Sequence, residues 1–382
     1  MNKVRIGVAG LGNMGSAHIR QILEGKIPRL EVSAISDIDP QRLSQFPEIK
    51  NFTSSEEMIR SGEIDAILIT TPHYSHTTIG IDALKNGLHV LVEKPISVHK
   101  ADCEKLIAAH TNKKQVFAAM FNQRTDPYYI KIRNLVKSGE LGEIRRINWI
   151  ITNWFRTETY YASGGWRATW GGEGGGVLLN QCPHNLDLYQ WIFGLPDKVR
   201  SFCRFGHYHK IEVEDDVTAY FEYASGATGI FITSTGEAPG TNRLEITGER
   251  GKLVYENDEI RFTRNEVEMT KFSRTTKESF SAPPTWDVKI PVNGHGGQHN
   301  EILKNFTDAI LDGKPLIAPA KEGIHSVELA NAILQSTFDQ KAIELPIHAA
   351  AYKKKLQARI ANSKIKKKTV KTVVTDFSKS FK

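Results

Sequence analysis

The chain has 382 residues, which is enough for two or three domains that each bury a core of their own. With 40% hydrophobic and 24% charged residues, its composition is that of a globular protein and excludes a low-complexity or fibrous chain. No apolar run approaches the ~18 residues needed to cross a bilayer, so we expect no membrane partner.

The net charge of +7 is concentrated at one end of the chain. Residues 347–382 hold eleven Lys and Arg residues and a single acid, Asp376, so the rest of the chain has a net charge of −3. We therefore expect 347–382 to be a basic C-terminal extension, either a solvated tail or an electrostatic contact for a partner. Because the remainder is mildly acidic, we expect no nucleic-acid partner.

The first residues run straight into an apolar strand pattern and lack the h-region of a signal peptide. The three cysteines are odd in number and widely spaced, which fits neither a disulfide framework nor a zinc site. We therefore expect a soluble protein of the reducing cytoplasm.

Residues 1–125 alternate short apolar runs with helical stretches, the pattern of a parallel sheet covered on both faces. The expected elements are strands at 4–9, 31–36, 66–70, 89–92 and 116–120, with a helix at 14–25. This arrangement predicts a doubly wound α/β domain over residues 1–125.

The segment Gly10-Leu11-Gly12-Asn13-Met14-Gly15 directly follows the first strand and opens the first helix. Glycines allow the tight turn and a close approach of the backbone to a pyrophosphate, which the free N–H groups of a helix N-terminus then bind. In this strand–turn–helix context the motif predicts a dinucleotide site. Asp37, at the end of the second strand, would bind a ribose and repel a 2′-phosphate, which favours NAD over NADP; the alternative is an acidic turn.

Two further segments, Thr70-Thr71-Pro72-His73 and Glu93-Lys94-Pro95, follow buried strands. Ligands of a doubly wound sheet bind outside the carboxyl ends of the strands, and a residue before proline is held off a helix. Lys94 could therefore orient a hydroxyl in the cleft, although an ordinary surface lysine is the simpler alternative.

From about residue 145 the pattern changes to hairpins. A β-rich run at 145–154 is followed by period-two alternation at 216–223, a turn at 224–227 and a strand at 229–233. Helical stretches at about 299–312 and 321–338 are expected to pack back on the body. We therefore assign 126–346 to a second α/β domain, with a large open, mainly antiparallel sheet that serves substrate binding and oligomerisation.

The second domain contains three notable clusters. The glycine-rich run 171–176 indicates either close backbone approach or simple flexibility. In the run 180–187, Asn180 and His184 would share one helix face if the helix starts before Pro183, and His184 is either an acid–base group or a buried structural histidine. An aromatic and basic cluster over 156–170 suits a sugar ring or an interface loop. His73 with His76, and His207 with His209, lack a third ligand, so we expect no metal.

In their order, these motifs resemble the Gfo/Idh/MocA family of oxidoreductases, which includes glucose–fructose oxidoreductase and inositol dehydrogenase. The resemblance covers about residues 3–346 and rests on the Gly10–Gly15 loop, Thr71-Pro72, Glu93-Lys94-Pro95, and the glycine run followed by His184. It implies an N-terminal Rossmann domain, a C-terminal domain on an open sheet, and homodimers or homotetramers joined through that sheet.

The resemblance further implies that Lys94 and His184 are the catalytic pair, with His184 as acid/base and Lys94 positioning the reacting hydroxyl. Asn180 stands where inositol-dehydrogenase-like members carry aspartate. Since Asn cannot carry negative charge, this difference favours glycosides and other cyclic sugars over polyols as the substrate.

The expected catalytic residues are Lys94, His184 and Asn180. We place these residues at the cofactor: Gly10, Gly12, Asn13, Met14, Gly15, Asp37, Thr71, Pro72, His76, Glu93 and Lys94. We place these at the substrate: Lys94, Arg124, Tyr161, Trp166, Arg167, Asn180 and His184.

The expected activity is an NAD(P)-dependent oxidoreductase acting on a carbinol carbon of a sugar, glycoside or sugar derivative. The alternatives are an NAD-dependent glycosidase that works by transient oxidation and elimination, and a non-catalytic NAD-binding sensor.

Overall fold

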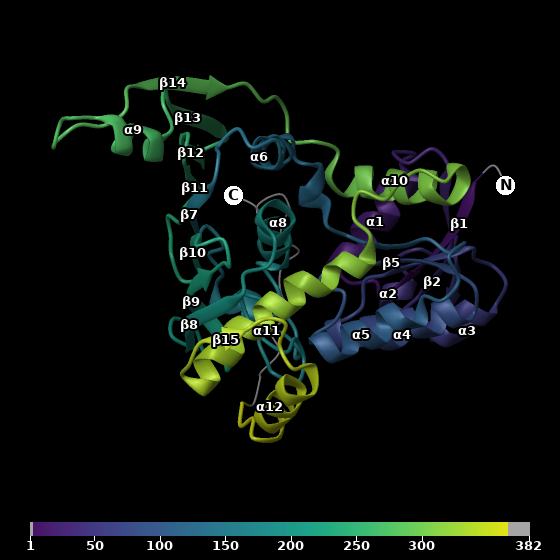
Figure 1. Ribbon diagram of the computed structural model, residues 1–382. Coiled ribbons are helices and arrows are strands. Elements are labelled where there is room, and N and C mark those ends of the chain that lie inside the picture. Colours follow the sequence, from purple (N-terminus) through teal and green to yellow (C-terminus); the bar gives the residue numbers. More distant parts are fainter. Residues whose placement is uncertain (1–2, 366–382) are drawn as a thin grey trace.

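A computed structural model describes residues 3–365 of the chain (Figure 1). Its N-terminal third is built on a six-stranded parallel sheet with the strand order β3-β2-β1-β4-β5-β6. The strands are Val4–Ala9 (β1), Leu30–Ser36 (β2), Lys50–Phe52 (β3), Ala66–Ile69 (β4), His89–Val92 (β5) and Phe117–Ala119 (β6). This order is that of a doubly wound dinucleotide-binding fold, so the predicted Rossmann architecture is confirmed.

The central strands are apolar throughout because helices cover both faces of the sheet. Every residue of β4 is fully buried, and β5 is buried after its first residue. The covering helices are Asn13–Leu23 (α1), Pro40–Leu43 (α2), Ser55–Arg60 (α3), His73–Lys85 (α4) and Lys100–Ala109 (α5). The N-terminal residues therefore form a layered α/β domain, in which the carboxyl ends of the strands are available for a binding site.

The second sheet has nine strands in the order β14-β13-β12-β11-β7-β10-β9-β8-β15. These strands are Ile144–Ile151 (β7), Lys198–Phe205 (β8), Glu214–Glu222 (β9), Thr228–Ser234 (β10), Asn242–Gly248 (β11), Gly251–Glu256 (β12), Glu259–Asn265 (β13), Thr285–Ile290 (β14) and Ile343–Glu344 (β15). Neighbouring strands are antiparallel except β7 and β10, so the large, mainly antiparallel sheet expected from the hairpin pattern is confirmed.

Helices cover one face of this sheet and join it to the N-terminal half (Figure 1). The remaining helices are the 3₁₀ segments Asn122–Thr125 (η1) and Ala320–Glu322 (η2), and the α-helices Pro127–Lys137 (α6), Glu158–Ala162 (α7), Pro183–Phe193 (α8), Met269–Thr275 (α9), Gln298–Asp312 (α10), Gly323–Asp339 (α11) and Ala349–Ala361 (α12). Helix α11 packs on β8, on α8 and on α5, and so touches both halves of the molecule. Among residues 3–365, no helix has the length and apolarity that crossing a bilayer would need.

Helix α10 belongs to the core of the first sheet although it lies far along the chain. Its residues Ile302, Leu303 and Phe306 are buried in the same hydrophobic cluster as β1 and β4. The cluster also includes Val327, near the start of α11. The N-terminal core is thus completed by residues more than 170 positions later in the sequence, which the expected boundary at 125 does not capture.

The C-terminal extension differs in part from the expected solvated tail. Residues Ala349–Ala361 form α12, and its Tyr352 and Leu356 are almost completely buried against the body. The lysines of this helix lie on its other faces. Because composition does not show on which face a residue lies, the lysine-rich composition gave no sign of the apolar stripe that packs on the body. Residues 366–382 lie outside the described residues.

Replacing Leu356 by alanine should lower the free energy of unfolding by about 2 kcal/mol, because the change removes buried apolar contacts and leaves a cavity under α12. Urea denaturation would measure the loss. Gln357→Ala, an exposed position on the same helix, is the matched control and should leave stability nearly unchanged. Equal stabilities of the two variants would contradict the packing described here.

Candidate active site

The glycine loop between β1 and α1 has the geometry that a pyrophosphate requires. Gly10 has a φ of +93°, in the left-handed region. Gly12 is the N-cap of α1 without any side-chain cap, and a Cβ placed on it would meet no atom within 4 Å. The open backbone at Gly12 and the uncapped N–H groups of α1 fit a dinucleotide phosphate.

Asp37 lies at the end of β2 beside this loop. Its carboxylate accepts a 2.6 Å hydrogen bond from the Leu11 N–H and a 2.9 Å bond from the Asp39 N–H, and Arg42 Nη1 lies 3.5 Å away. These two backbone N–H groups fix the Asp37 side chain against the glycine loop. Its position at the strand end is the one expected for a ribose ligand.

The ends of β4 and β5 are connected by a buried histidine. His76 contacts the Thr71 carbonyl oxygen through Nε2 at 2.7 Å and the Pro95 carbonyl oxygen through Nδ1 at 2.8 Å. Each ring nitrogen thus lies against a backbone carbonyl oxygen, and the neutral ring donates its single N–H to one of the two. His76 therefore braces the segments that follow β4 and β5, and its predicted place at the cofactor stays a prediction.

Glu93 is also a positioning group. One carboxylate oxygen accepts from the Lys94 N–H at 3.1 Å, and the other lies 2.9 Å from His18 Nε2. Burial by itself would raise the pKa of Glu93, but the hydrogen bond from His18 and the charges of His18, His299 and Lys94 lower it to about 2. Glu93 is therefore a buried carboxylate next to Lys94.

Lys94 and Asn180 meet across the cleft. The Lys94 ammonium donates a 2.9 Å hydrogen bond to the backbone oxygen of Asn180. The side-chain oxygen of Asn180 accepts from the Tyr160 hydroxyl at 3.1 Å, and its amide nitrogen donates to Glu173. Because α8 starts only at Pro183, Asn180 does not share a helix face with His184, and the turn before α8 brings Asn180 to Lys94 instead.

His184 is in the first turn of α8, pointing into the same region. It is only 4% exposed, its ring meets Phe121 edge-on, and its Nδ1 has no hydrogen-bond partner. Burial lowers the pKa of His184 well below its usual value, and the charges of Lys94 and His299 lower it further. At neutral pH the imidazole is therefore uncharged and able to accept a proton.

These buried histidines predict acid lability. Burial is the main cause that lowers the pKa values of His73, His76 and His184 below 6.5. The unfolded chain then binds more protons than the folded chain below that pH, so stability is complete above about pH 6.5 and is lost as the pH falls. The slope should approach about 1.4 kcal/mol per pH unit for each such histidine. Urea titrations at about pH 7.5 and pH 5 measure it, and equal free energies of unfolding would contradict the prediction.

An arginine–aromatic cluster, formed by Arg156, Tyr160, Trp166 and Arg167, flanks Asn180. The guanidinium groups of Arg156 and Arg167 lie 5.2 Å and 4.7 Å from the Tyr160 ring, and Arg167 is also 4.7 Å from the Trp166 ring. Arg167 Nη1 donates to the Tyr160 hydroxyl at 3.0 Å. The predicted substrate residues Trp166 and Arg167 are therefore connected to Asn180 through Tyr160.

Two other predicted substrate residues are placed elsewhere. Arg124 is 2% exposed and forms a two-pronged ion pair with Asp187, with Nη1 bonded to Glu322, so its guanidinium is an internal strut. Tyr161 is buried and donates a 2.7 Å hydrogen bond to Thr235. Sequence reasoning could not separate these side chains from ligand-facing ones, because their partners lie more than 60 residues away. Their places as substrate contacts stay predictions.

The glycine run at 171–176 is required by close packing rather than flexibility. A Cβ on Gly176 would lie 2.0 Å from the backbone oxygen of Glu214. Gly174 has a φ of +75°, and a Cβ on it would lie 2.0 Å from Val98 Cγ1. The segment forms turns before α8 and contains no strand. These contacts hold Glu173, in the middle of the run, in a fixed position.

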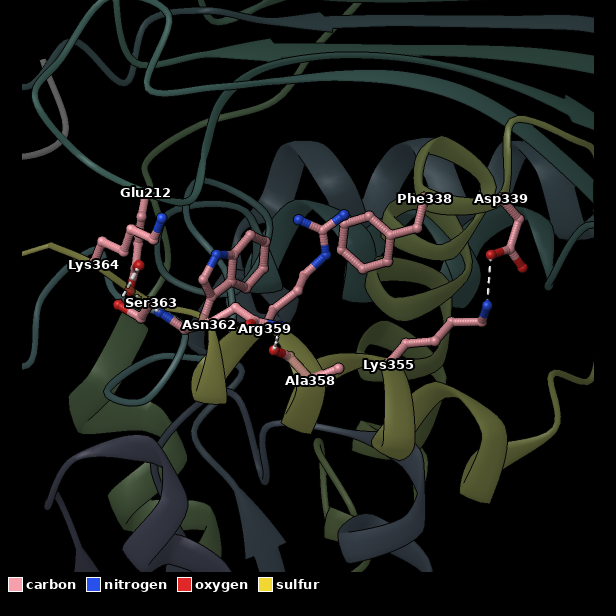
Figure 2. A pocket seen from close by; sticks show the side chains of 10 residues that line it. Glu212, Phe338, Asp339, Lys355, Ala358, Arg359, Asn362, Ser363 and Lys364 are labelled. Carbon is pink, nitrogen blue, oxygen red and sulfur yellow. Dashed lines mark hydrogen bonds and ion pairs between the residues drawn. The ribbon is translucent and has the colours of Figure 1, made fainter.

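A groove along α12 is separate from this site (Figure 2). The Arg359 guanidinium packs 3.6 Å from the Phe338 ring centroid, while Lys355 pairs with Asp339 and Ser363 donates to Glu212. Neither Lys94 nor any other predicted site residue lines the groove. We take the cluster of Lys94, Asn180 and His184 as the candidate active site.

Sequence reasoning missed three buried groups near Lys94. His18 follows Gly15 by one helical turn on the buried face of α1, which a polar residue in an apolar stripe could have signalled. Glu173, an acid inside a glycine run, carried a similar signal. His299, whose ring lies 5.4 Å from that of His18, carried none, because only the packing of α10 brings it to the cleft.

Comparison with known proteins agrees with this architecture. Residues 4–121 match the model of the oxidoreductase family with an NAD-binding Rossmann fold, and residues 129–254 match that of the GFO/IDH/MocA C-terminal domain. Myo-inositol 2-dehydrogenase from Thermotoga maritima is 23% identical over 353 residues, which are 90% of this chain and 98% of that protein.

Two solved structures share the fold. The WlbA dehydrogenase from Bordetella pertussis, in complex with NADH and UDP-GlcNAcA, is 23% identical with a TM-score of 0.76, over 91% of this chain and 100% of that chain. Levoglucosan dehydrogenase, in complex with NADH and levoglucosan, is 20% identical with a TM-score of 0.74, over 90% and 100% of the two chains.

The two family matches follow one another along the chain and describe the two sheets observed. The expected NAD cofactor is confirmed by the match of residues 4–121 to an NAD-binding domain, which agrees with the open glycine loop at α1. The chain is an oxidoreductase that belongs to the Gfo/Idh/MocA family.

Proposed function

We propose that this oxidoreductase transfers a hydride between NAD and a hydroxyl carbon of a cyclic sugar or glycoside. The observation that carries the proposal is the state of His184: a buried, uncharged imidazole with an unpartnered Nδ1, within the electrostatic reach of Lys94. A carbinol that loses a hydride must also lose a proton, and such an imidazole can accept it.

Each catalytic residue then has one role. His184 takes the hydroxyl proton as the carbon is oxidised. Lys94 holds the reacting oxygen by a hydrogen bond from its ammonium, and Asn180 fixes Lys94 through its backbone oxygen. NAD, when bound, supplies the hydride acceptor; the protein contributes position and proton transfer.

The cofactor would be held by the first half of the chain. Gly10, Gly12, Asn13, Met14 and Gly15 would bind its pyrophosphate at the start of α1, and Asp37 would bind the adenosine ribose. The negative charge of Asp37 favours NAD over NADP. Thr71 and Pro72, at the end of β4, would line the nicotinamide side.

The substrate class is supported by the arginine–aromatic cluster. Trp166 presents a flat apolar face, and Arg167 and Tyr160 provide hydrogen-bonding groups beside it, a combination that suits a sugar ring. WlbA and levoglucosan dehydrogenase were solved with sugar compounds bound, which agrees with a cyclic sugar here.

Incubation with NAD and a panel of cyclic sugars, glycosides and polyols tests this function. Absorbance of the reduced nicotinamide should rise with at least one cyclic sugar, and mass spectrometry should find a product two hydrogens lighter. Release of an aglycone without net NADH would instead indicate a glycosidase that oxidises transiently. Cofactor binding without any product would indicate a sensor, and either result would overturn the proposal.

We also propose that the uncovered face of the nine-stranded sheet joins the subunits of a homodimer or homotetramer. Phe202 on β8 and Tyr220 on β9 project from this face and are 62% and 40% exposed. Phe202→Glu should therefore shift the sedimenting species toward a monomer, because it buries a charge in the interface. Phe280→Glu, at a fully exposed loop position, is the control. A monomeric wild-type protein would contradict this assembly.

A further inference from the structure

Glu173 lies against Asn180, the catalytic residue whose side chain cannot ionise. Its side chain is almost completely buried, at 2% exposure. One carboxylate oxygen accepts a hydrogen bond from the side-chain amide of Asn180, and the other accepts from the Ala168 backbone N–H. The close packing of the glycine run fixes the backbone on either side of it. Glu173 is therefore held in a single orientation toward Asn180.

Lys94 is surrounded by groups of both signs. Burial lowers the pKa of Lys94, and the positive charges of Arg156 and Arg167 lower it as well. Among the described residues that influence the pKa of Lys94 most, the carboxylates that raise it are Glu93 and Glu173. The other ionisable groups near the ammonium are neutral at neutral pH: His73, His76, Cys182, His184 and His299.

The two carboxylates have different partners. Glu93 precedes Lys94 in the chain and pairs with His18. Glu173 faces Lys94 from the opposite side of the cleft, through Asn180, whose backbone oxygen binds the ammonium. An aspartate at position 180 would carry a negative charge on its own side chain. Asn180 is neutral, and the charge is instead on Glu173, whose carboxylate accepts a hydrogen bond from the Asn180 amide.

We propose that Glu173 is a positioning residue that supplies, through Asn180, the negative charge keeping Lys94 protonated and directed at the reacting hydroxyl. This inference rests on the proposed function for its catalytic meaning. The charge relation itself belongs to the protein alone and exists without cofactor or substrate. It predicts that charge, and not only shape, is required at position 173.

The test is the protonation of Lys94 in the cofactor-free protein. Acetic anhydride labelling at a series of pH values, followed by mass spectrometry of the Lys94 peptide, gives the midpoint at which the amine becomes reactive. Glu173→Gln keeps the size and one of the two hydrogen-bond acceptors but removes the charge, so the midpoint should fall by about one pH unit. Glu212→Gln is the matched control: this carboxylate accepts bonds from the Trp170 N–H and the Ser363 hydroxyl in the groove along α12 and should not move the midpoint.

A double variant moves the charge instead of deleting it. Glu173→Gln combined with Asn180→Asp restores a carboxylate beside Lys94, so the midpoint should return toward that of the wild type. A wild-type midpoint in Glu173→Gln overturns the proposal. If Glu173→Gln does not fold, the double variant alone is the test. A midpoint in the double variant about one pH unit below that of the wild type would then overturn the proposal. Since no sugar is needed, failure here is distinct from failure of the proposed oxidation.

Discussion

Replacing His184 by alanine is expected to lower turnover by two orders of magnitude or more and to leave the affinity for NADH unchanged. General acid–base catalysis contributes roughly 10²–10⁴ to a rate, and His184 offers an uncharged imidazole with an unpartnered Nδ1 for this role. The loss should appear in kcat, because proton removal belongs to the reaction step and not to binding.

Steady-state kinetics on the sugar found in the panel, together with NADH titration by fluorescence, measures both quantities. His207→Ala, at an exposed position outside the cleft, should behave as the wild type. If His184→Ala loses NADH affinity while turnover of the bound complex persists, then His184 has been assigned the wrong role. A thermal melt of the variant separates either result from misfolding.

The second large effect is expected in the glycine loop, where two alanine substitutions should fail for different reasons. At Gly12, φ is −71° and a Cβ meets no protein atom, so the variant should fold normally. The added methyl group would stand where the pyrophosphate must approach, and NADH affinity should fall roughly tenfold or more.

At Gly15, a Cβ would lie 2.0 Å from the Gly10 oxygen and 2.6 Å from Thr70 Oγ1. Because both atoms belong to the packed end of the sheet, Gly15→Ala should lower the free energy of unfolding by about 3 kcal/mol. Urea denaturation and NADH titration of the two variants should therefore give opposite patterns. A destabilised Gly12→Ala with intact cofactor affinity would contradict the geometry of the loop.

The parts of the fold that follow local rules could be predicted from the sequence. The buried strands β4 and β5 are continuous apolar runs, and the hairpin of β9 and β10 alternates with period two, so both sheets were expected. Lys94 could be placed at a strand end because Pro95 prevents a helix there. These features depend on a few neighbouring residues.

The parts that depend on long-range packing could not be predicted. Arg124 is of a residue type that often binds ligands. Its guanidinium instead forms ion pairs with Asp187 and Glu322, which lie far away in the sequence. The turn that brings Asn180 to Lys94 depends on Glu214, which accepts from the backbone of the preceding glycine run. No local pattern contains these pairings, so the roles of the side chains became clear only in the folded chain.

The placement of α10 has a consequence for how the protein is made. The six strands of the first sheet leave the ribosome long before Leu303 and Phe306, which fill the hydrophobic cluster against β1 and β4. Until those residues emerge, the nascent first half exposes an apolar surface that nothing in its own sequence covers. The first sheet therefore cannot bury its core until residues as far along as Phe306 have been synthesised. During that interval the exposed cluster is a binding site for a chaperone that recognises apolar surface.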